Sequence, residues 1–260
     1  MQEEQNHMYP QDFMVNNQHD ITEKMRAYLV DWLSELHLKF KLWPETLYVC
    51  IGIIDKYIML QPEIKKKDLQ CLGITALHIA GKYEEIYPPE LWQILRVTDN
   101  AVSKEQVLAL EFNILQTLDF NLTFPSILRF MERYARIAQV NERALTLAQY
   151  FCDTCLLDCT LMKERPSKLA AVCIYAALRL SKGLTNPNQL IWNATLTKNT
   201  GFKEDEVRGM ALDLIKFVRN VEQSSLQSLY KKYSSPRFLE AAKLITHLPT
   251  TKPHQRLKVC

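Results

Sequence analysis

The chain has 260 residues, 47% of them apolar and 23% charged, and a formal net charge of +3 at pH 7. This balance is typical of a globular protein with one large domain or two of about 100 to 130 residues, and the charge is too small to indicate a nucleic-acid partner. No apolar run reaches the roughly 18 residues of a membrane-spanning helix, the opening MQEEQNHMYP does not fit a secretory signal, and the six glycines form neither a dinucleotide-binding nor a phosphate-binding loop.

The first half of the chain consists of helix-length apolar patterns separated by turn signals. In the stretch MRAYLVDWLSEL (25–36), apolar residues cover more of the helix circumference than one core-facing stripe requires. This predicts either a centrally buried helix or a helix with a second side for a partner. Ser103 and Gln106 have the spacing of a capping box. Helices are predicted for 20–40, 45–59, 67–84, a short segment from Glu90, and 103–118.

The second half of the chain repeats this pattern. Residues 202–218 match 102–118 at an offset of 100, and LAAVCIYAALR matches LGITALHIAGK at an offset of 97. Helices rich in Ala and Gly let neighbours approach closely, so we expect these two segments to be the central helices of two similar bundles, joined near 120–125. Further helices are predicted for 126–138, 141–160 and 166–181, whereas the periodicity ends after about Lys243. Few stretches alternate with period two, so the predicted fold class is all-α.

The cysteines indicate buried thiols. Seven is an odd number, and six of them lie in apolar, helix-like stretches, which is typical of a reducing compartment. The densest group, Cys152, Cys155 and Cys159, has spacings that a metal site can use. The same positions share one face of a helix, however, and no second Cys or His pair lies nearby. We therefore expect core cysteines, with no metal and no other cofactor.

Several stretches resemble the cyclins. MRAYLVDWLSEL resembles the opening of a cyclin box, and DITEKMR, ETLYVCIGIIDKYI, ITALHIA, GKYEEIYPPE and LEFNILQTLDFNLTFP resemble A/B-type mitotic cyclins in order and spacing. LQSLYKKYSSPRF is similar to a B-type ending. The resemblance implies two tandem five-helix cyclin-box bundles at 20–123 and 124–240, after an N-terminal segment (1–19) and before a loose tail (241–260). It also implies a non-catalytic regulatory subunit that activates a cyclin-dependent Ser/Thr kinase at G2/M, in the nucleus and cytoplasm.

The resemblance assigns a kinase-binding surface. The Lys of GKYEEIYPPE and the Glu of LEFNIL correspond to Lys82 and Glu111, which are expected to form charge-assisted hydrogen bonds around the regulatory helix of the kinase. Leu115, Phe120 and Leu122 correspond to apolar contacts with the same helix. Without the resemblance, Lys82 would be read as a solvated helix end and Glu111 as a surface carboxylate.

The resemblance also assigns a binding function to a second face of the first helix. Val30 and Leu33 are expected to face the bundle, while a docking patch would bind Arg-x-Leu-type motifs of substrates and inhibitors. In such a patch a ligand Leu enters an apolar groove and its Arg lies near Glu35. Tyr28 stands where many relatives carry an aliphatic residue, so its ring is expected to narrow the groove. The residues assigned to the patch are Met25, Tyr28, Leu29, Trp32, Glu35, Leu69 and Gln70.

Two further expectations follow from the resemblance. Arg26 and Asp55 correspond to a buried ion pair that ties the first helix to the second. Mitotic cyclins usually place an extra helix before the box, and only about 20 residues precede the box here, so we expect most of that helix to be missing.

Other functional classes fit the sequence less well. An enzyme is disfavoured because His37, His78, His247 and His254 are scattered, and the adjacent Glu84 and Glu85 would point about 100° apart on a helix. A TFIIB-like two-bundle adaptor would bring a zinc ribbon and basic helices, and a transcription-type cyclin is the nearer alternative. The expected partners are thus a cyclin-dependent kinase and motif-bearing substrates, with no nucleic acid and no membrane.

Overall fold

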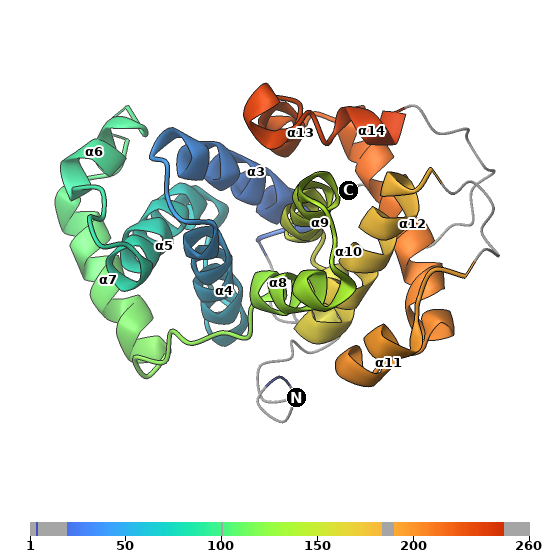
Figure 1. Ribbon diagram of the computed structural model, residues 1–260. Coiled ribbons are helices and arrows are strands. Elements are labelled where there is room, and N and C mark those ends of the chain that lie inside the picture. Colours follow the sequence, from blue (N-terminus) through green and yellow to red (C-terminus); the bar gives the residue numbers. More distant parts are fainter. Residues whose placement is uncertain (1–3, 5–19, 100, 184–189, 247–260) are drawn as a thin grey trace. The chain divides into compact units, whose positions relative to one another are not determined.

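The computed structural model describes residues 4, 20–99, 101–183 and 190–246, and within these residues the regular structure is helical, with no strand (Figure 1). The chain divides into two compact units. One contains residues 9–126, and the other contains residues 127–260 together with residues 1–8. None of the described helices is long and apolar enough to cross a membrane.

The first unit contains five α-helices in its described part. Their positions agree with the predicted ones, and the short helix expected from Glu90 begins at Leu91. A 3₁₀ turn, η1, precedes the third of them. The elements are α3 (Glu23–Lys39), α4 (Pro44–Leu60), η1 (Lys66–Asp68), α5 (Leu69–Glu84), α6 (Leu91–Arg96) and α7 (Lys104–Thr117).

Local sequence signals set the ends of these helices. Thr22 caps α3, since its hydroxyl oxygen accepts a hydrogen bond from the Met25 amide at 3.3 Å. Pro44 occupies the first turn of α4, where its missing N–H costs nothing. The predicted capping box starts α7, because Ser103 Oγ accepts from the Gln106 amide at 3.2 Å while the Ser103 amide donates to Gln106 Oε1 at 2.8 Å.

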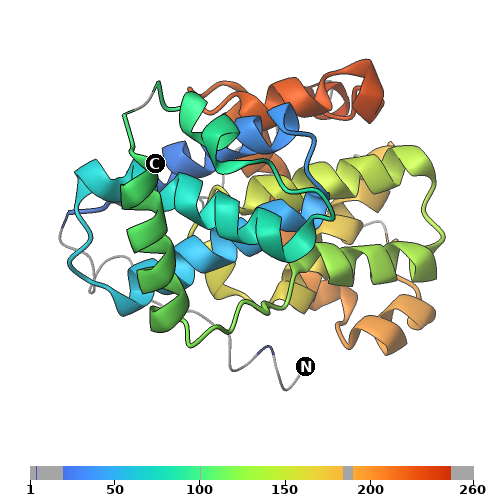
Figure 2. The ribbon, with the colours of Figure 1, turned by 90° about the vertical axis from the view of Figure 1, so that its left-hand side faces the viewer.

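Helix α5 is the central helix of the first unit, as its small residues predicted. It packs against α3, α4, α6 and α7, which surround it in Figures 1 and 2. Ala76 and Ala80 are fully buried. A methyl group built on Gly73 would lie 2.7 Å from Leu29 Cδ1, closer than carbon atoms can approach. The absence of a side chain at Gly73 therefore sets how closely α3 approaches α5.

A buried ion pair ties α3 to α4. Arg26 Nε donates to Asp55 Oδ1 and Arg26 Nη2 donates to Asp55 Oδ2, both at 2.6 Å, and neither side chain is exposed. The structure thus brings together the two residues that the resemblance paired. Such a fork-to-carboxylate contact fixes orientation as well as distance.

The second unit repeats the first. Its central helix, α10, packs against α8, α9, α11 and α12. Leu69 and Pro166, which begin α5 and α10, are 97 residues apart, as are Glu84 and Ser181, which end them. The elements of the second unit are α8 (Ile127–Ala138), α9 (Glu142–Cys155), η2 (Leu161–Lys163), α10 (Pro166–Ser181), α11 (Ala194–Thr200), α12 (Glu204–Glu222), α13 (Ser228–Tyr233), η3 (Pro236–Phe238) and α14 (Lys243–Thr246).

The cysteine group belongs to the core of the second unit. Cys152, Cys155 and Cys159 are all buried, which confirms the core interpretation. The prediction of one continuous helix over 141–160 is wrong, because α9 ends at Cys155 and Cys159 follows in a turn. Cys155 Sγ lies 3.9 Å from Cys173 Sγ, so these two sulfur atoms are in contact but do not form a disulfide. Among the described residues no three metal-ligating side chains are grouped to hold an ion.

The chain beyond α12 is packed further than the sequence predicted. Asp153 Oδ2 accepts from Lys232 Nζ at 2.7 Å and from the Tyr233 hydroxyl at 2.8 Å, and all three residues are buried. Ala241 and Ile245 are fully buried, although the tail was expected to be loose from residue 241 onward. Two apolar positions at i and i+4 are too few for periodicity to register, which explains the error for 241–246. Residues 247–260 lie outside the described part.

Most of the N-terminal segment also lies outside the described residues, with the exception of Glu4. Its Oε1 accepts from the Ser167 amide at 2.8 Å and its Oε2 accepts from the Ser167 hydroxyl at 3.1 Å. The carboxylate therefore satisfies an amide in the first turn of α10, where negative charge is favoured. The expectation about a missing N-terminal helix concerns residues that the structure does not describe.

The ion pair between Arg26 and Asp55 gives a stability prediction. Arg26→Ala or Asp55→Ala should each lower the free energy of unfolding by about 3–5 kcal/mol, because each leaves one buried charge without its partner. The double variant Arg26→Met/Asp55→Leu should lose less than either single variant, since it leaves no charge behind. Urea unfolding followed by far-UV circular dichroism measures all three. A double variant as unstable as the sum of the single ones would contradict this account.

A carboxyl group in α12 gives a pH prediction. Burial raises the pKa of Glu222 from 4.5 to about 7, against the opposing effect of Arg219. The folded state thus holds this proton more tightly than the unfolded state, so the stabilisation is complete below pH 4.5 and is lost as the pH rises through about 7. Glu222→Gln should therefore become more stable than the unaltered chain toward pH 8. Urea titrations across this range test it, with the exposed Glu142→Gln as control, and a pH-independent difference would refute it.

Candidate functional site: a charged pair within an exposed apolar surface

Lys82 and Glu111 form an ion pair between α5 and α7. Lys82 lies in the last turn of α5 and Glu111 in the middle of α7, and Lys82 Nζ donates to Glu111 Oε1. The Lys82 side chain is 45% exposed, whereas that of Glu111 is 11% exposed. The interpretation of Glu111 as a surface carboxylate is therefore wrong, while Lys82 keeps nearly half of its side chain exposed.

The helices favour these two positions. A cation in the last turn of α5 lies near the negative end of the helix dipole. His78 lies one turn before Lys82 on the same helix, and its pKa is lowered by burial and by the Lys82 charge, against the opposing pull of Glu111. A neutral His78 adds no second cation beside Lys82.

Large apolar side chains are exposed around the pair. Tyr83 is 50% exposed and follows Lys82 directly, and Phe120 is 67% exposed beyond the end of α7. Phe112 and Leu108 are also exposed on α7. Exposed apolar side chains on the elements that carry a charged pair are typical of a protein-binding site.

The structure separates the predicted kinase-binding residues into two groups. Lys82, Leu115 and Phe120 offer surface, since Leu115 is partly exposed and the other two are exposed. Leu122 is buried, so its position does not support a direct contact, and Glu111 is buried except for the 11% of its side chain that is exposed.

Sequence reasoning missed three exposed residues of this surface: Tyr83, Leu108 and Phe112. The signal for two of them was present, because Leu108, Phe112 and Leu115 recur at i, i+4 and i+7 and so form a second apolar stripe on α7. The first stripe, which includes the buried Val107 and Ile114, accounts for the core alone.

The predicted docking patch on α3 is narrower than expected. Tyr28 is 44% exposed, Glu35 and Gln70 are exposed, and Met25 and Trp32 are partly exposed. Trp32 packs against a core cluster that includes Ile74 and Ile94.

Leu29 and Leu69 are buried, so placing these two in an open groove is wrong for the free chain. Leu29 lies against Gly73, where the missing side chain makes room for it. Val30 and Leu33 face the bundle as predicted, since both are fully buried.

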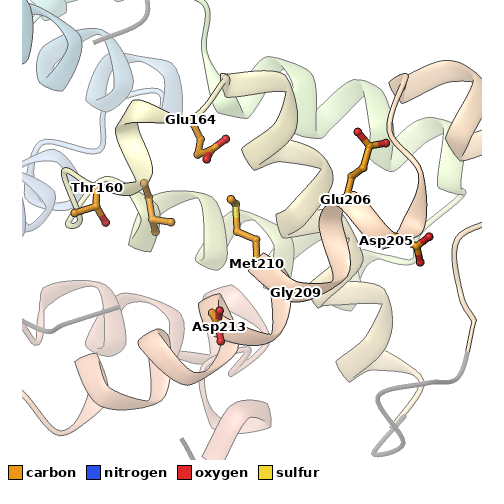
Figure 3. Close-up of a pocket in the computed structure, with 8 residues that line it drawn as sticks. Thr160, Glu164, Asp205, Glu206, Gly209, Met210 and Asp213 are labelled. Carbon is orange, nitrogen blue, oxygen red and sulfur yellow. The ribbon is translucent and has the colours of Figure 1, made fainter. Parts of the chain in front are cut away.

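The second unit contains a surface pocket of about 370 Å³ (Figure 3). Leu161 and Met210 contribute apolar surface, and four carboxylates lie around them: Glu164, Asp205, Glu206 and Asp213. Glu164 accepts from Lys168 Nζ at 2.9 Å and Asp213 from Lys216 Nζ at 3.1 Å. Two of the four carboxylates are thus paired with lysines of the same chain.

Glu85 and His37 make contacts within the fold. Glu85 Oε1 accepts from the Trp43 amide at 2.7 Å and from the Thr46 hydroxyl at 2.5 Å, so this carboxylate ties the α3–α4 connection to the end of α5. His37 Nε2 lies 2.8 Å from the Trp43 carbonyl oxygen. His247 and His254 lie outside the described residues.

Comparison with known proteins identifies the family. The family model for the cyclin N-terminal domain matches residues 1–123, and that for the cyclin C-terminal domain matches residues 125–247. The chain is 34% identical to the G2/mitotic-specific cyclin S13-7 of Glycine max, over 90% of this chain and 88% of that protein. This chain belongs to the cyclin family.

Within the family, its relatives include B-type cyclins. It is 37% identical to the G2/mitotic-specific cyclin-B of Marthasterias glacialis over 86% of this chain, but it spans only 56% of that protein's length, and 64% of the cyclin-B of Hydra vulgaris. A viral cyclin from herpesvirus saimiri has the same fold, with a TM-score of 0.69 at 17% identity over 88% of this chain and 96% of that one. The resemblance to cyclins and the predicted all-α fold of two tandem cyclin domains are thereby confirmed, and the transcription-type and TFIIB-like alternatives are not favoured.

Proposed function

We propose that this chain is a regulatory subunit that binds and activates a cyclin-dependent Ser/Thr kinase at G2/M. The observation that carries the proposal is the Lys82–Glu111 pair, set among the exposed Tyr83, Phe112 and Phe120. A charged pair within apolar surface fixes the register of a partner, while the aromatic side chains supply most of the binding energy. The B-type relatives support the mitotic class of kinase regulator.

The activity would come from a shift of the kinase between conformations. A kinase requires a regulatory helix that carries a Glu to be placed against its catalytic Lys. A partner surface that binds the active placement more tightly than the inactive one shifts the population toward activity by that difference in affinity. The chain needs no catalytic group for this task, so we infer that it is a non-catalytic activator, at work where its kinase is, in the nucleus and cytoplasm.

The Lys82–Glu111 pair is suited to such selection. An ammonium group has three donors and a carboxylate several acceptor sites, so each group can bond the other and a partner at the same time. The ion pair lowers the desolvation penalty that arises when a partner covers both charges, since each charge keeps the other as its neighbour when water is removed.

We further propose that the exposed part of the α3 patch recruits substrates and inhibitors with Arg-x-Leu-type motifs. Tyr28, Trp32 and Met25 provide the accessible apolar surface, and Glu35 provides a carboxylate for an Arg. A single buried Leu contributes roughly 1.5–3 kcal/mol, which suits weak and reversible docking. A ligand that enters between Tyr28 and the first turn of α5 would have to displace the tightly packed Leu29 or lie above it.

A charge swap tests the kinase-binding surface. The variant Lys82→Glu/Glu111→Lys keeps an internal ion pair but reverses both charges toward a partner. We expect a loss of stability of about 0.3–1 kcal/mol, because a carboxylate now lies at the negative end of the α5 dipole, and a loss of kinase activation of at least tenfold, as for close charge pairs across interfaces. The measurement is phosphate transfer to a generic Ser-Pro peptide by a purified, activation-loop-phosphorylated cyclin-dependent kinase. Full activation by the swapped variant would show that the pair serves only the fold, and no activation by the unaltered chain would refute the proposed function.

Substrate recruitment is tested separately. Tyr28→Ala and Glu35→Ala alter exposed side chains of α3, so the fold should persist. We expect them to raise KM roughly tenfold for a substrate with an Arg-x-Leu motif, because one apolar contact and one charge contact are lost. Phosphorylation of a short peptide without the motif should be unchanged. Equal losses on both substrates would assign these residues to kinase binding or folding instead.

A further inference from the structure

The turn after α7 has a backbone conformation that recurs in the turn after η3, where Leu239 has φ of 54° and Glu240 has φ of 52°. The helices α3 and α8 end with a single residue at positive φ, Lys41 and Gln139, as helix ends commonly do. After α7 two such residues follow one another, Asp119 with φ of 50° and Phe120 with φ of 56°. Asp tolerates this left-handed region, whereas a bulky aromatic residue does so only under strain. The strained residue is also 67% exposed, so no burial of its ring compensates for the strain.

Packing on both sides of the turn holds this conformation. Leu118 and Leu122 are buried, and the residues between them are exposed, so the chain leaves the core and returns within four residues. The Phe120 amide donates to the Leu115 carbonyl oxygen and the Asn121 amide donates to that of Leu118, both at 2.9 Å. With both flanks fixed, the ring of Phe120 is directed outward.

Two more contacts anchor the far end of the turn. A methyl group built on Gly52 in α4 would lie 2.9 Å from Phe124 Cδ2, so the Phe124 ring lies directly on the bare backbone of Gly52. The Tyr83 and Thr123 hydroxyl oxygens are 3.2 Å apart, within hydrogen-bonding distance. Tyr83 directly follows Lys82, so this contact links the turn to the charged pair of the kinase-binding surface.

We propose that residues 118–124 form a strained presenting turn that holds the Phe120 ring in place for the kinase, and that Gly52 and Tyr83 are its positioning residues. The inference rests on the proposed function and specifies how one of its contacts is made. Strain that the surrounding structure maintains at an exposed aromatic residue is the pattern expected of a preorganised contact. Gly52 and Tyr83 act through Phe120: they fix where its ring lies, and the ring contacts the partner.

A double-mutant cycle tests the proposal. Gly52→Ala pushes the Phe124 ring away, and we expect roughly tenfold weaker binding to a purified, phosphorylated cyclin-dependent kinase, the size of coupling seen between residues that share a contact network. In a Phe120→Ala chain the same substitution should change the affinity less than about twofold, since the ring that it misplaces is absent. Equal losses in both backgrounds would overturn the positioning role.

The control is a second glycine under the same constraint. Gly73→Ala also inserts a methyl group into a tight contact, but against Leu29 on α3. It should lower the melting temperature as Gly52→Ala does and leave the kinase affinity unchanged. If Gly52→Ala does not fold, Phe124→Leu loosens the same contact without adding an atom, and Tyr83→Phe removes only the hydroxyl group.

Amide hydrogen exchange provides a readout without the kinase. The Phe120 amide is bonded to Leu115 O, so Gly52→Ala should accelerate its exchange at least tenfold while the amide of Ile114, inside α7, is unaffected. Unchanged exchange at Phe120 would overturn the inference. Kinase binding that is insensitive to Phe120→Ala would also overturn it and leave the proposed function standing, whereas an unaltered chain that binds no such kinase would refute the proposed function itself.

Discussion

The buried contact between Arg26 and Asp55 is the constraint on which the first unit depends. The two residues are 29 positions apart in sequence. Two hydrogen bonds of 2.6 Å join the guanidinium group to the carboxylate, and neither side chain is exposed to water. A forked contact permits one rotation of α3 about its axis, because both hydrogen bonds must be aligned. This rotation buries Val30 and Leu33 and leaves Tyr28 exposed. The pair thus contributes orientation more than stability, since an apolar pair of similar volume would hold the helices as well.

Close packing at glycine supplies the second constraint and acts on both proposed surfaces. Gly73 admits Leu29 and so brings α3 to α5, while Gly52 admits the Phe124 ring and so fixes the chain beyond α7. In each case a side chain that borders a binding surface is held by a position with no side chain of its own. Since protein interiors tolerate few gaps and few overlaps, such contacts transmit small shifts in packing to the surface.

Much of the fold followed from the sequence, because helical periodicity, capping signals and small-residue helices act locally. The offset of 97 residues between α5 and α10 and the capping box at Ser103 are examples. The exposure of single residues did not follow, because it depends on what lies over a helix face. Leu29, Leu69 and Leu122 are buried by neighbours that periodicity does not reveal. Lys82 and Glu111 were found only through the family resemblance, since their pairing joins two helices 29 residues apart in sequence.

The fold holds the parts of the candidate site with different rigidity. The Lys82–Glu111 pair lies on two helices that are fixed by the core, whereas Phe120 lies on a turn that is fixed by its flanks and by the contacts of Thr123 and Phe124. Charges on rigid helices set the register of a partner and reject a mismatched one, because a wrong charge opposite them costs more than a poor apolar fit. An aromatic residue held in advance adds affinity, because less freedom is lost on binding. Partner choice should therefore depend on the helices and binding strength on the turn, so substitutions in the turn would change how tightly a kinase is held without changing which kinase is chosen.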